Sequence, residues 1–212
     1  MATNPYADAA PLLKYFLTRI GNPADVELLI NEAGLGPPPD PDAYRLARVL
    51  DSMGSGRKTI ADVRTALNEQ KDFDNKILYG RQKDSSKLTG DGRTIIGAHS
   101  PRILAHPTFQ ILSQSLNADG TNGVECRKLL SQGPTPVWSR NKTSTLAPPS
   151  WSNNDIFHAG EEAAKTDPVF VRARDGATLH RTSINGVQWE VIMQGTVMTS
   201  SYPTGGVPST GI

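Results

Sequence analysis

The first residues of the chain place their apolar side chains with the period of helices. Stretches 8–20 (DAAPLLKYFLTRI) and 23–34 (PADVELLINEAG) repeat apolar residues at intervals of three and four, which is typical of amphipathic helices. Asn22 before Pro23 matches a helix N-cap followed by proline in the first turn, and Gly34 is well placed to end the second helix. The pattern therefore predicts two helices at the start of the chain.

A connector and two further helices are expected after this pair. Three consecutive prolines at 37–39 cannot continue a helix. Helical spacing of apolar residues resumes at 41–50 and again from 59 to about 71. Together these stretches predict a small helical bundle. Because the bundle shows no cluster of catalytic side chains, we expect it to serve in packing or in delivery.

The pattern changes near Asp74 to short runs of β-branched residues separated by Gly, Asn, Asp and Pro, as in a β-rich domain. Runs 109–116 and 123–130 flank an Asp-Gly pair, which is a hairpin signal. Three more runs follow between 177 and 203, and the pair Asn185-Gly186 separates the first two. This part of the chain predicts an antiparallel meander.

One more helix is expected between these two β clusters. Ser150 or Ser152 can cap a helix that runs to about Lys165. The order β, helix, β predicts an α+β fold. We divide the chain into a small helical segment at 1–73 and a β-rich domain at 74–212.

Composition limits the other classes to which the chain could belong. With 212 residues and 37% apolar content it can build a core. The single cysteine, Cys126, excludes an internal disulfide, lacks the neighbours of a zinc cluster, and is expected to be buried. No apolar run approaches the roughly 18 residues of a membrane-spanning helix, and the N-terminus lacks a signal-peptide pattern. We expect a soluble protein without a membrane-spanning segment.

Charge is distributed unevenly along the chain. The formal net charge is +1, but residues 1–75 carry 8 Lys and Arg against 11 Asp and Glu, whereas residues 76–212 carry 14 against 10. A basic run at 76–102 surrounds His99 and lies just before His106. This run favours contact with a phosphate backbone, although an ordinary solvated face is the plainer alternative.

Three separated segments resemble one known family. They are GAHSPRI at 97–103, NKTSTLAPPSWSNNDI at 141–156, and the closing stretch at 175–205 that ends in SSYPTG. Each resembles, in the same order, a segment of the bacterial EndoU-type endoribonuclease domains found at the C-termini of secreted polymorphic toxins. The resemblance covers roughly residues 75–206 and implies an EndoU or RNase A-like antiparallel β-rich catalytic domain.

The resemblance also implies the site residues. His99 takes the place of the family's catalytic histidine, and Ala98 replaces a glycine of the usual Gly-Gly-His loop. Many relatives carry an earlier histidine in a His-Ile-Leu-x-Gly motif, where this chain has Lys76. His106 is one candidate for the missing group. The expected catalytic residues are His99, Lys142, Ser144, Thr199, Tyr202 and His106. The expected substrate contacts are Thr145, Ser201, Lys76, Arg102 and His180, and no residue is assigned to a metal.

These residue types suit RNA cleavage without a metal. In that reaction the 2′-hydroxyl attacks its own phosphodiester, so one group must accept a proton and another must supply one to the departing 5′-oxygen. Histidine suits both tasks near neutral pH. Lysine and hydroxyl donors can stabilise the charge that builds on phosphorus, and an aromatic ring can hold a base. Ser144 or Thr145, and Thr199 or Ser201, are the hydroxyl candidates.

The leading interpretation is a toxin endoribonuclease that leaves 2′,3′-cyclic phosphate and 5′-hydroxyl ends. No cofactor is required, although a divalent metal ion could modulate binding. The resemblance implies an RNA substrate, a cognate immunity protein, an otherwise monomeric enzyme, and delivery as a secreted effector into the cytoplasm of a target cell. The chain would then be the C-terminal part of a longer secreted protein, with a pretoxin or translocation region before the nuclease.

Two other interpretations stay open at this point. The chain could be a catalytically weakened EndoU-like module that binds RNA or a protein. A cell-wall glycosidase is suggested by TGDGRT at 89–94, but Glu161 and Glu162 are adjacent on the expected helix and so point in different directions. The three tryptophans are expected in the core rather than as RNA-stacking platforms.

Overall fold

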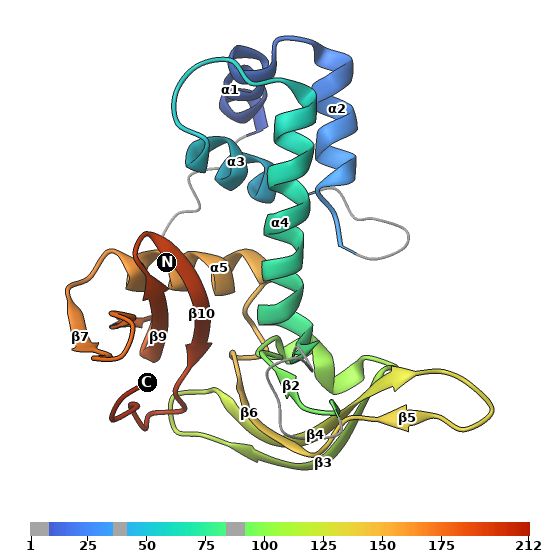
Figure 1. Cartoon of the computed structure of the whole chain (residues 1–212), viewed down its shortest axis with the longest axis vertical. Helices are drawn as coiled ribbons and strands as arrows, with labels where there is room; N and C mark the ends of the chain where they lie inside the picture. The colour runs from blue at the N-terminus through green and yellow to red at the C-terminus, as the bar shows by residue number, and fades with distance from the viewer. Residues whose placement is uncertain (1–8, 36–41, 84–91) are drawn as a thin grey trace. The chain divides into compact units, whose positions relative to one another are not determined.

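The computed structural model describes residues 9–35, 42–83 and 92–212, and the chain divides into two compact units, Met1–Asn75 and Lys76–Ile212 (Figure 1). In the described residues, five α-helices and three antiparallel sheets form the fold. This arrangement confirms the α+β prediction with its N-terminal helices. Parts of two predicted features, the proline connector and the basic run, lie outside the described residues at 36–41 and 84–91.

The first unit is a bundle of helices around an apolar core. It contains α1 (Ala9–Ile20), α2 (Pro23–Glu32), α3 (Ala43–Ser52) and most of α4 (Ile60–Tyr79). The Asn22 side chain accepts a hydrogen bond from the N–H of Ala24, which confirms the predicted cap of α2. The third helix begins later than predicted because the Asp42 side chain caps it. Phe16, Leu29, Leu46 and Leu50 are among the fully buried core residues.

Helix α4 ends two turns later than the sequence pattern predicts. We expected it to end near Lys71, with β structure from about Asp74, but it continues to Tyr79. The extra turns bury Ile77 and Leu78 completely. The run Ile-Leu-Tyr has strand character when it is considered alone, so burial in the second unit decides its conformation. As a result, Lys76 lies on the last turn of a helix.

One four-stranded sheet of the second unit is centred on β4 (Asn122–Ser131). Strand β3 (Phe109–Leu116) pairs with one edge of β4, and β5 (Val137–Trp138) and β6 (Lys142–Leu146) both pair with the other edge. A small sheet of β1 (Arg81–Gln82) and β2 (Ile95–Ile96) and a 3-10 helix, η2 (Pro101–Ala105), precede it. Strand β6 is formed by the polar run that carries Lys142, which the sequence pattern did not identify as a strand.

The other four-stranded sheet is the predicted meander, extended by one strand. Its order is β10 (Val197–Pro203), β9 (Val187–Gln194), β8 (Thr178–Ile184) and β7 (Pro168–Val171). Asn185 and Gly186 both have positive φ, 51° and 82°, at the turn between β8 and β9, as a two-residue hairpin requires.

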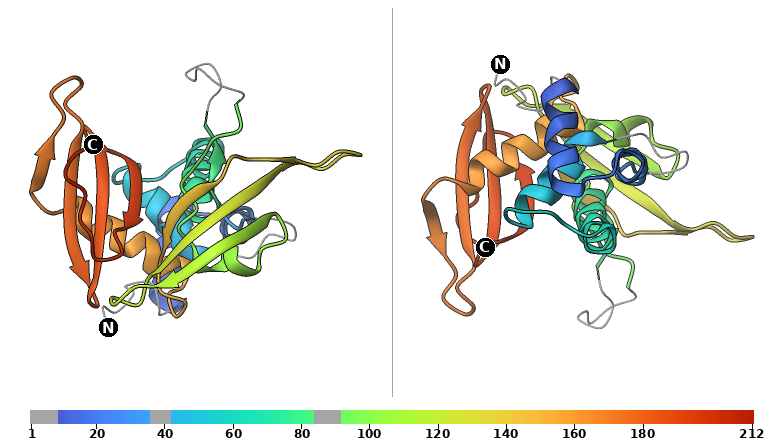
Figure 2. Two further views of the ribbon diagram at one scale, coloured as in Figure 1. Left: turned by 90° about the horizontal axis from the view of Figure 1, so that it is seen from below. Right: turned by 90° about the horizontal axis from the view of Figure 1, so that it is seen from above.

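Helix α5 (Asn153–Ala164) lies along one face of this meander sheet (Figures 1 and 2). Ser152 and Asp155 form a capping box at its start, which confirms the expected helix and selects Ser152 as its cap. Gly160 of α5 lets the helix approach β10, since a Cβ there would lie 2.6 Å from the Ser201 hydroxyl. Beneath the helix, Trp189 is fully buried, as expected, and stacks on Trp151.

Candidate active site

The loop that carries His99 is fixed by the end of helix α4. A helix leaves its last carbonyl groups without partners inside the helix. Here the backbone N–H groups of Ala98, His99 and Ser100 donate to the carbonyls of Lys76, Ile77 and Leu78, at 3.2, 2.8 and 3.1 Å. The Lys128 ammonium donates hydrogen bonds to the next two carbonyls, those of Tyr79 and Gly80. The loop therefore has a single position relative to the last turn of α4.

Two consecutive residues of this loop have left-handed backbone conformations. Gly97 has φ 81°, and a Cβ there would lie 1.8 Å from the carbonyl oxygen of Lys76, so only glycine fits. Ala98 has φ 67°, a conformation that costs an L-residue about 1–2 kcal/mol. Ala98 stands where the resemblance places a glycine, and its backbone still adopts the conformation that glycine favours.

Hydrogen bonds determine which nitrogen of the His99 ring carries the proton. Nδ1 lies 2.9 Å from the carbonyl oxygen of Thr145 and 3.3 Å from the Ser144 hydroxyl. The Ser144 hydroxyl donates its own proton to the carbonyl of Ala98, at 2.7 Å. Because neither oxygen has a proton to give to Nδ1, Nδ1 must be the donor. In the neutral ring, Nε2 then carries the lone pair.

The environment of His99 keeps the imidazole neutral. The residue is only 9% exposed, and burial lowers its pKa to about 4. The bond to Thr145 opposes this shift, while the positive charges of Lys142 and Lys76 add to it. At neutral pH the ring is therefore an uncharged base with two ammonium groups close enough to affect it.

The two lysines come from different elements. Lys142 is half-buried on β6, where burial lowers its pKa, and its ammonium donates to the carbonyl of Thr143 at 3.3 Å. Lys76 is on the last turn of α4, and its ammonium donates to the carbonyl of Thr199 on β10. Both lysines are thus close enough to His99 for their charges to lower its pKa, one from β6 and one from α4.

Tyr202, on β10, joins His99, Lys76 and Lys142 in the candidate site. Its ring centroid lies 5.9 Å from that of His99, with the planes tilted by 33°. Burial is the main reason that the pKa of the phenol is raised, so the hydroxyl stays protonated. The hydroxyl lies 3.5 Å from that of Ser209. Tyr202 therefore presents a neutral aromatic ring beside the imidazole.

The neighbouring hydroxyl residues on β10 have different environments. Ser201 is buried, accepts a hydrogen bond from the Trp189 indole at 2.7 Å, and faces the helix α5. Thr199 is exposed, and its hydroxyl donates to the carbonyl of Ile192 at 3.1 Å. Of the two hydroxyl candidates on β10, Thr199 is the one whose backbone carbonyl accepts a hydrogen bond from the Lys76 ammonium.

Two of the expected histidines have partners away from this group. His106 lies against the rings of Tyr79 and Phe109, at 5.2 and 6.0 Å between centroids, and its Nδ1 is 2.9 Å from the Thr108 hydroxyl. Burial, followed by the charge of Lys128, lowers its pKa. His180 has both ring nitrogens occupied: Nδ1 lies 2.6 Å from the carbonyl of Thr166, and Nε2 lies 2.8 Å from the hydroxyl of Thr178. The contacts of both rings are thus with residues other than His99.

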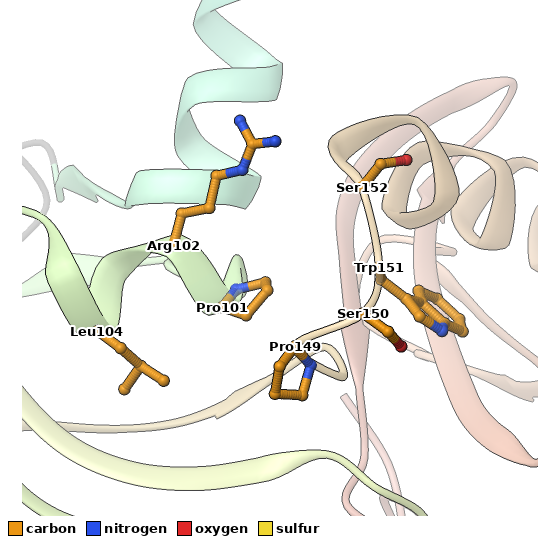
Figure 3. A pocket seen from close by; sticks show the side chains of 7 residues that line it. All are labelled: Pro101, Arg102, Leu104, Pro149, Ser150, Trp151 and Ser152. Carbon is orange, nitrogen blue, oxygen red and sulfur yellow. The ribbon is translucent and has the colours of Figure 1, made fainter.

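A groove of about 380 Å³ opens beside η2, the 3-10 helix that follows His99 (Figure 3). Pro101, Arg102 and Leu104 line one wall, and Pro149, Ser150, Trp151 and Ser152 line the other. The second wall follows β6 directly in the chain, and the N–H of Ala147 donates to the carbonyl of His99. The sequence analysis placed the Ser-Trp-Ser stretch in a segment that resembles the family, with a serine as helix cap and Trp151 in the core, and did not predict that it lines a groove.

In the part of the chain that the structure describes, no cluster of three or more His, Cys, Asp or Glu side chains is arranged to hold a metal ion. None of the helices in ranges 9–35, 42–83 and 92–212 combines the length and the hydropathy that a bilayer span requires.

Most of the chain matches a known protein family. The family model described as bacterial EndoU nuclease matches residues 70–205, which is more than half of the chain. No curated protein and no solved structure matches. The matched range contains the last turn of α4, the His99 loop, β6 and β10, from which the group around His99 is built. The chain therefore belongs to the bacterial EndoU nuclease family.

Proposed function

We propose that this nuclease is an endoribonuclease that cleaves RNA by transphosphorylation and leaves 2′,3′-cyclic phosphate and 5′-hydroxyl ends. One observation supports this most strongly. His99 is a buried neutral imidazole whose Nδ1 is anchored by the Thr145 carbonyl, beside two ammonium groups and a tyrosine ring. This arrangement supplies the base and the positive charge that the reaction requires.

In the first half of the reaction, Nε2 of His99 accepts the proton of the 2′-hydroxyl. The 2′-oxygen forms a bond to phosphorus, and negative charge builds on the non-bridging oxygens. The Lys142 ammonium stabilises that charge. Because Lys142 is half-buried, little water screens the interaction. The bond from phosphorus to the 5′-oxygen then breaks. DNA has no 2′-hydroxyl and cannot follow this route.

Tyr202 and the groove bind the nucleotides around the scissile phosphate. Unpaired bases stack on aromatic rings in proteins that bind single strands, and the Tyr202 ring lies next to the imidazole. The strand continues along the groove, where the exposed Arg102 faces a phosphate. Thr145 and Thr199 contribute hydroxyl contacts, while Ser201 supports β10 from beneath through Trp189.

The biological setting we propose is a toxin delivered into the cytoplasm of a target cell. Loss of RNA there would be lethal, so the producing cell needs a cognate immunity protein. We propose that the enzyme is otherwise monomeric. The proposed chemistry passes through side chains alone, and a divalent ion would act only on RNA binding.

Labelled single-stranded RNA tests this function directly. We expect cleavage that His99→Ala abolishes, products with cyclic phosphate and 5′-hydroxyl ends, and no cleavage when the scissile nucleotide is 2′-deoxy. Cleavage of the deoxy substrate would contradict transphosphorylation. Retention of RNA by the wild-type protein without any cleavage would instead support a binding module. Lys165→Ala, on an exposed lysine of α5's C-terminal end, is the control that should cleave normally.

A further inference from the structure

The proposed reaction needs a proton donor for the departing 5′-oxygen, and the histidines do not supply one. His99 already acts as the base. The rings of His106 and His180 are held by other partners, and His158 lies on α5. The protonated groups that act on His99 are the ammonium groups of Lys76 and Lys142. The Tyr202 phenol beside the ring is also protonated, but burial raises its pKa and makes it a weaker acid, so we take one of the two lysines as the donor.

Lys76 is tied to both halves of the site. Its carbonyl oxygen accepts the N–H of Ala98 at 3.2 Å, and it leaves no room for a side chain at Gly97, so its backbone holds the His99 loop. Its side chain extends to β10 and donates to the carbonyl of Thr199, three residues before Tyr202. The ammonium of Lys76 is thus held at the β10 side of the site.

Lys142 is held by a different strand. It belongs to β6, the strand whose Ser144 and Thr145 hold the Nδ1 of His99, and its ammonium contacts that strand's own Thr143 carbonyl. In an in-line displacement, the attacking and leaving oxygens are on opposite sides of phosphorus. The His99 ring is anchored by β6, which also carries Lys142, whereas the ammonium of Lys76 extends from α4 and is held by a carbonyl of β10. This difference separates the roles of the two lysines.

We propose that Lys76 is the catalytic proton donor to the 5′-oxygen, while Lys142 stabilises charge; this assignment rests on the proposed function. As the bond from phosphorus to the 5′-oxygen breaks, a proton moves from Nζ of Lys76 to that oxygen. Lys76 is left as a neutral amine and His99 as an imidazolium. Exchange with water returns a proton to Lys76 and removes one from His99, so the protons balance over one turnover.

The chain offers a matched pair of variants for this proposal. Lys76→Ala removes both the charge and the proton. Lys76→Arg keeps the positive charge and a donor for the Thr199 carbonyl, but a guanidinium does not give up its proton in proteins. A role in proton transfer predicts that both variants fail alike, whereas a role in binding charge predicts that arginine replaces lysine well.

The experiment compares two substrates that differ at the leaving atom. One is an ordinary RNA strand, and the other carries sulfur in place of the 5′-oxygen at a single linkage. A thiol has a much lower pKa than an alcohol, so a thiolate leaves without being protonated. We expect both Lys76 variants to lower kcat on the oxygen substrate by about 10²–10⁴-fold and to cleave the sulfur substrate within about tenfold of the wild-type rate.

Lys142→Ala and His99→Ala should slow both substrates alike, because charge stabilisation and the base are still needed with sulfur. Equal losses on both substrates in the Lys76 variants would overturn the assignment, as would full activity of Lys76→Arg on the oxygen substrate. Circular dichroism spectra that match the wild type establish that the variants fold. If the wild-type protein cleaves neither substrate, the proposed function itself fails, which is a different result from failure of the Lys76 assignment.

Discussion

At the scale of single residues, the site depends on how His99 is held. One ring nitrogen is committed to a backbone carbonyl, and the ring is buried. The same burial that keeps the imidazole neutral makes it costly to protonate. Burial of the ring therefore affects both its role as base and the stability of the fold. Enzyme kinetics measures the first effect, and urea unfolding across a pH series measures the second.

Lys142→Ala should lower kcat by about 10²–10³-fold while KM changes little, since its charge is needed most when the phosphorane forms. Lys142 also depresses the pKa of His99. The acidic limb of kcat/KM, which reports the free enzyme, should therefore move to higher pH in this variant. Steady-state kinetics across a pH series checks both effects. An unchanged kcat would remove the proposed charge-stabilising role.

The free energy of unfolding should fall as pH drops from about 6.5 toward 4. Unfolded His99 takes up a proton near its ordinary pKa of about 6.5, whereas folded His99 does so only near a pKa of about 4. Between these values the unfolded state binds more protons, so lowering the pH favours unfolding. The loss attributable to His99 is at most about 3 kcal/mol.

Urea unfolding followed by tryptophan fluorescence measures this, because all three tryptophans lie in the second unit. His99→Asn keeps a side-chain N–H donor for Thr145 and removes the titration, so the pH dependence should flatten. His158→Asn is the matched control and should keep the wild-type slope. A wild-type slope in His99→Asn would show that the buried ring does not control acid stability.

At the scale of elements, the position of His99 depends on its loop, which caps the C-terminal end of α4. Gly97 lies against the carbonyl of Lys76, and the N–H groups of the next three residues donate to the last carbonyls of α4. Gly97→Ala would place a Cβ against the Lys76 carbonyl and force an unfavourable φ. We expect a loss of about 2–4 kcal/mol in stability together with loss of cleavage.

Gly133→Ala is the control for this change, because no atom lies within 4 Å of a Cβ there; its effect should stay within about 0.5 kcal/mol. Urea unfolding of both variants gives the comparison. If Gly97→Ala were as stable as Gly133→Ala, the loop would have to relax away from α4, and the fixed position of His99 would not be required.

Elements with local signals were predictable from the sequence. The Asn185-Gly186 hairpin and the Ser152 cap of α5 depend on residues next to one another, and both are present. The last two turns of α4 were not predictable, since burial of Ile77 and Leu78 overrides the strand character of that run. Strand β6 was also missed, because its alternating pattern is polar and its pairing with β4 is a tertiary contact.

The candidate site was likewise predictable only in part. The resemblance identified residues that the structure brings together, namely His99, Lys142, Lys76 and Tyr202. The sequence could not decide where His106 and His180 lie. Proximity of His106 to His99 in the chain suggested a shared site, but η2 turns the chain between them, and the ring joins Tyr79 and Phe109 instead.

At the scale of the whole molecule, the two units carry net charges of opposite sign. The net charge of +1 combines an acidic helical unit with a basic nuclease unit. Attraction to RNA should therefore arise in residues 76–212. Arg102 at the groove is the exposed basic residue that follows His99 most closely in the chain.

Salt dependence measures how many phosphates this unit contacts. For single strands, log Kobs falls with log salt concentration by about 0.7 for each phosphate neutralised. In a His99→Ala background, which prevents cleavage during the measurement, Arg102→Ala should weaken binding of a short RNA and reduce the slope by about 0.7. Fluorescence anisotropy between about 50 and 200 mM salt gives both quantities.

Arg174→Ala is the matched control, because Arg174 is an exposed arginine beside Asp175 in the turn between β7 and β8. It should leave the slope unchanged if RNA follows the groove. An equal reduction from both substitutions would mean that the whole basic unit attracts RNA without a defined path, whereas no reduction from Arg102→Ala would place the strand elsewhere. The comparison thus tests the path of the RNA independently of the chemistry at His99.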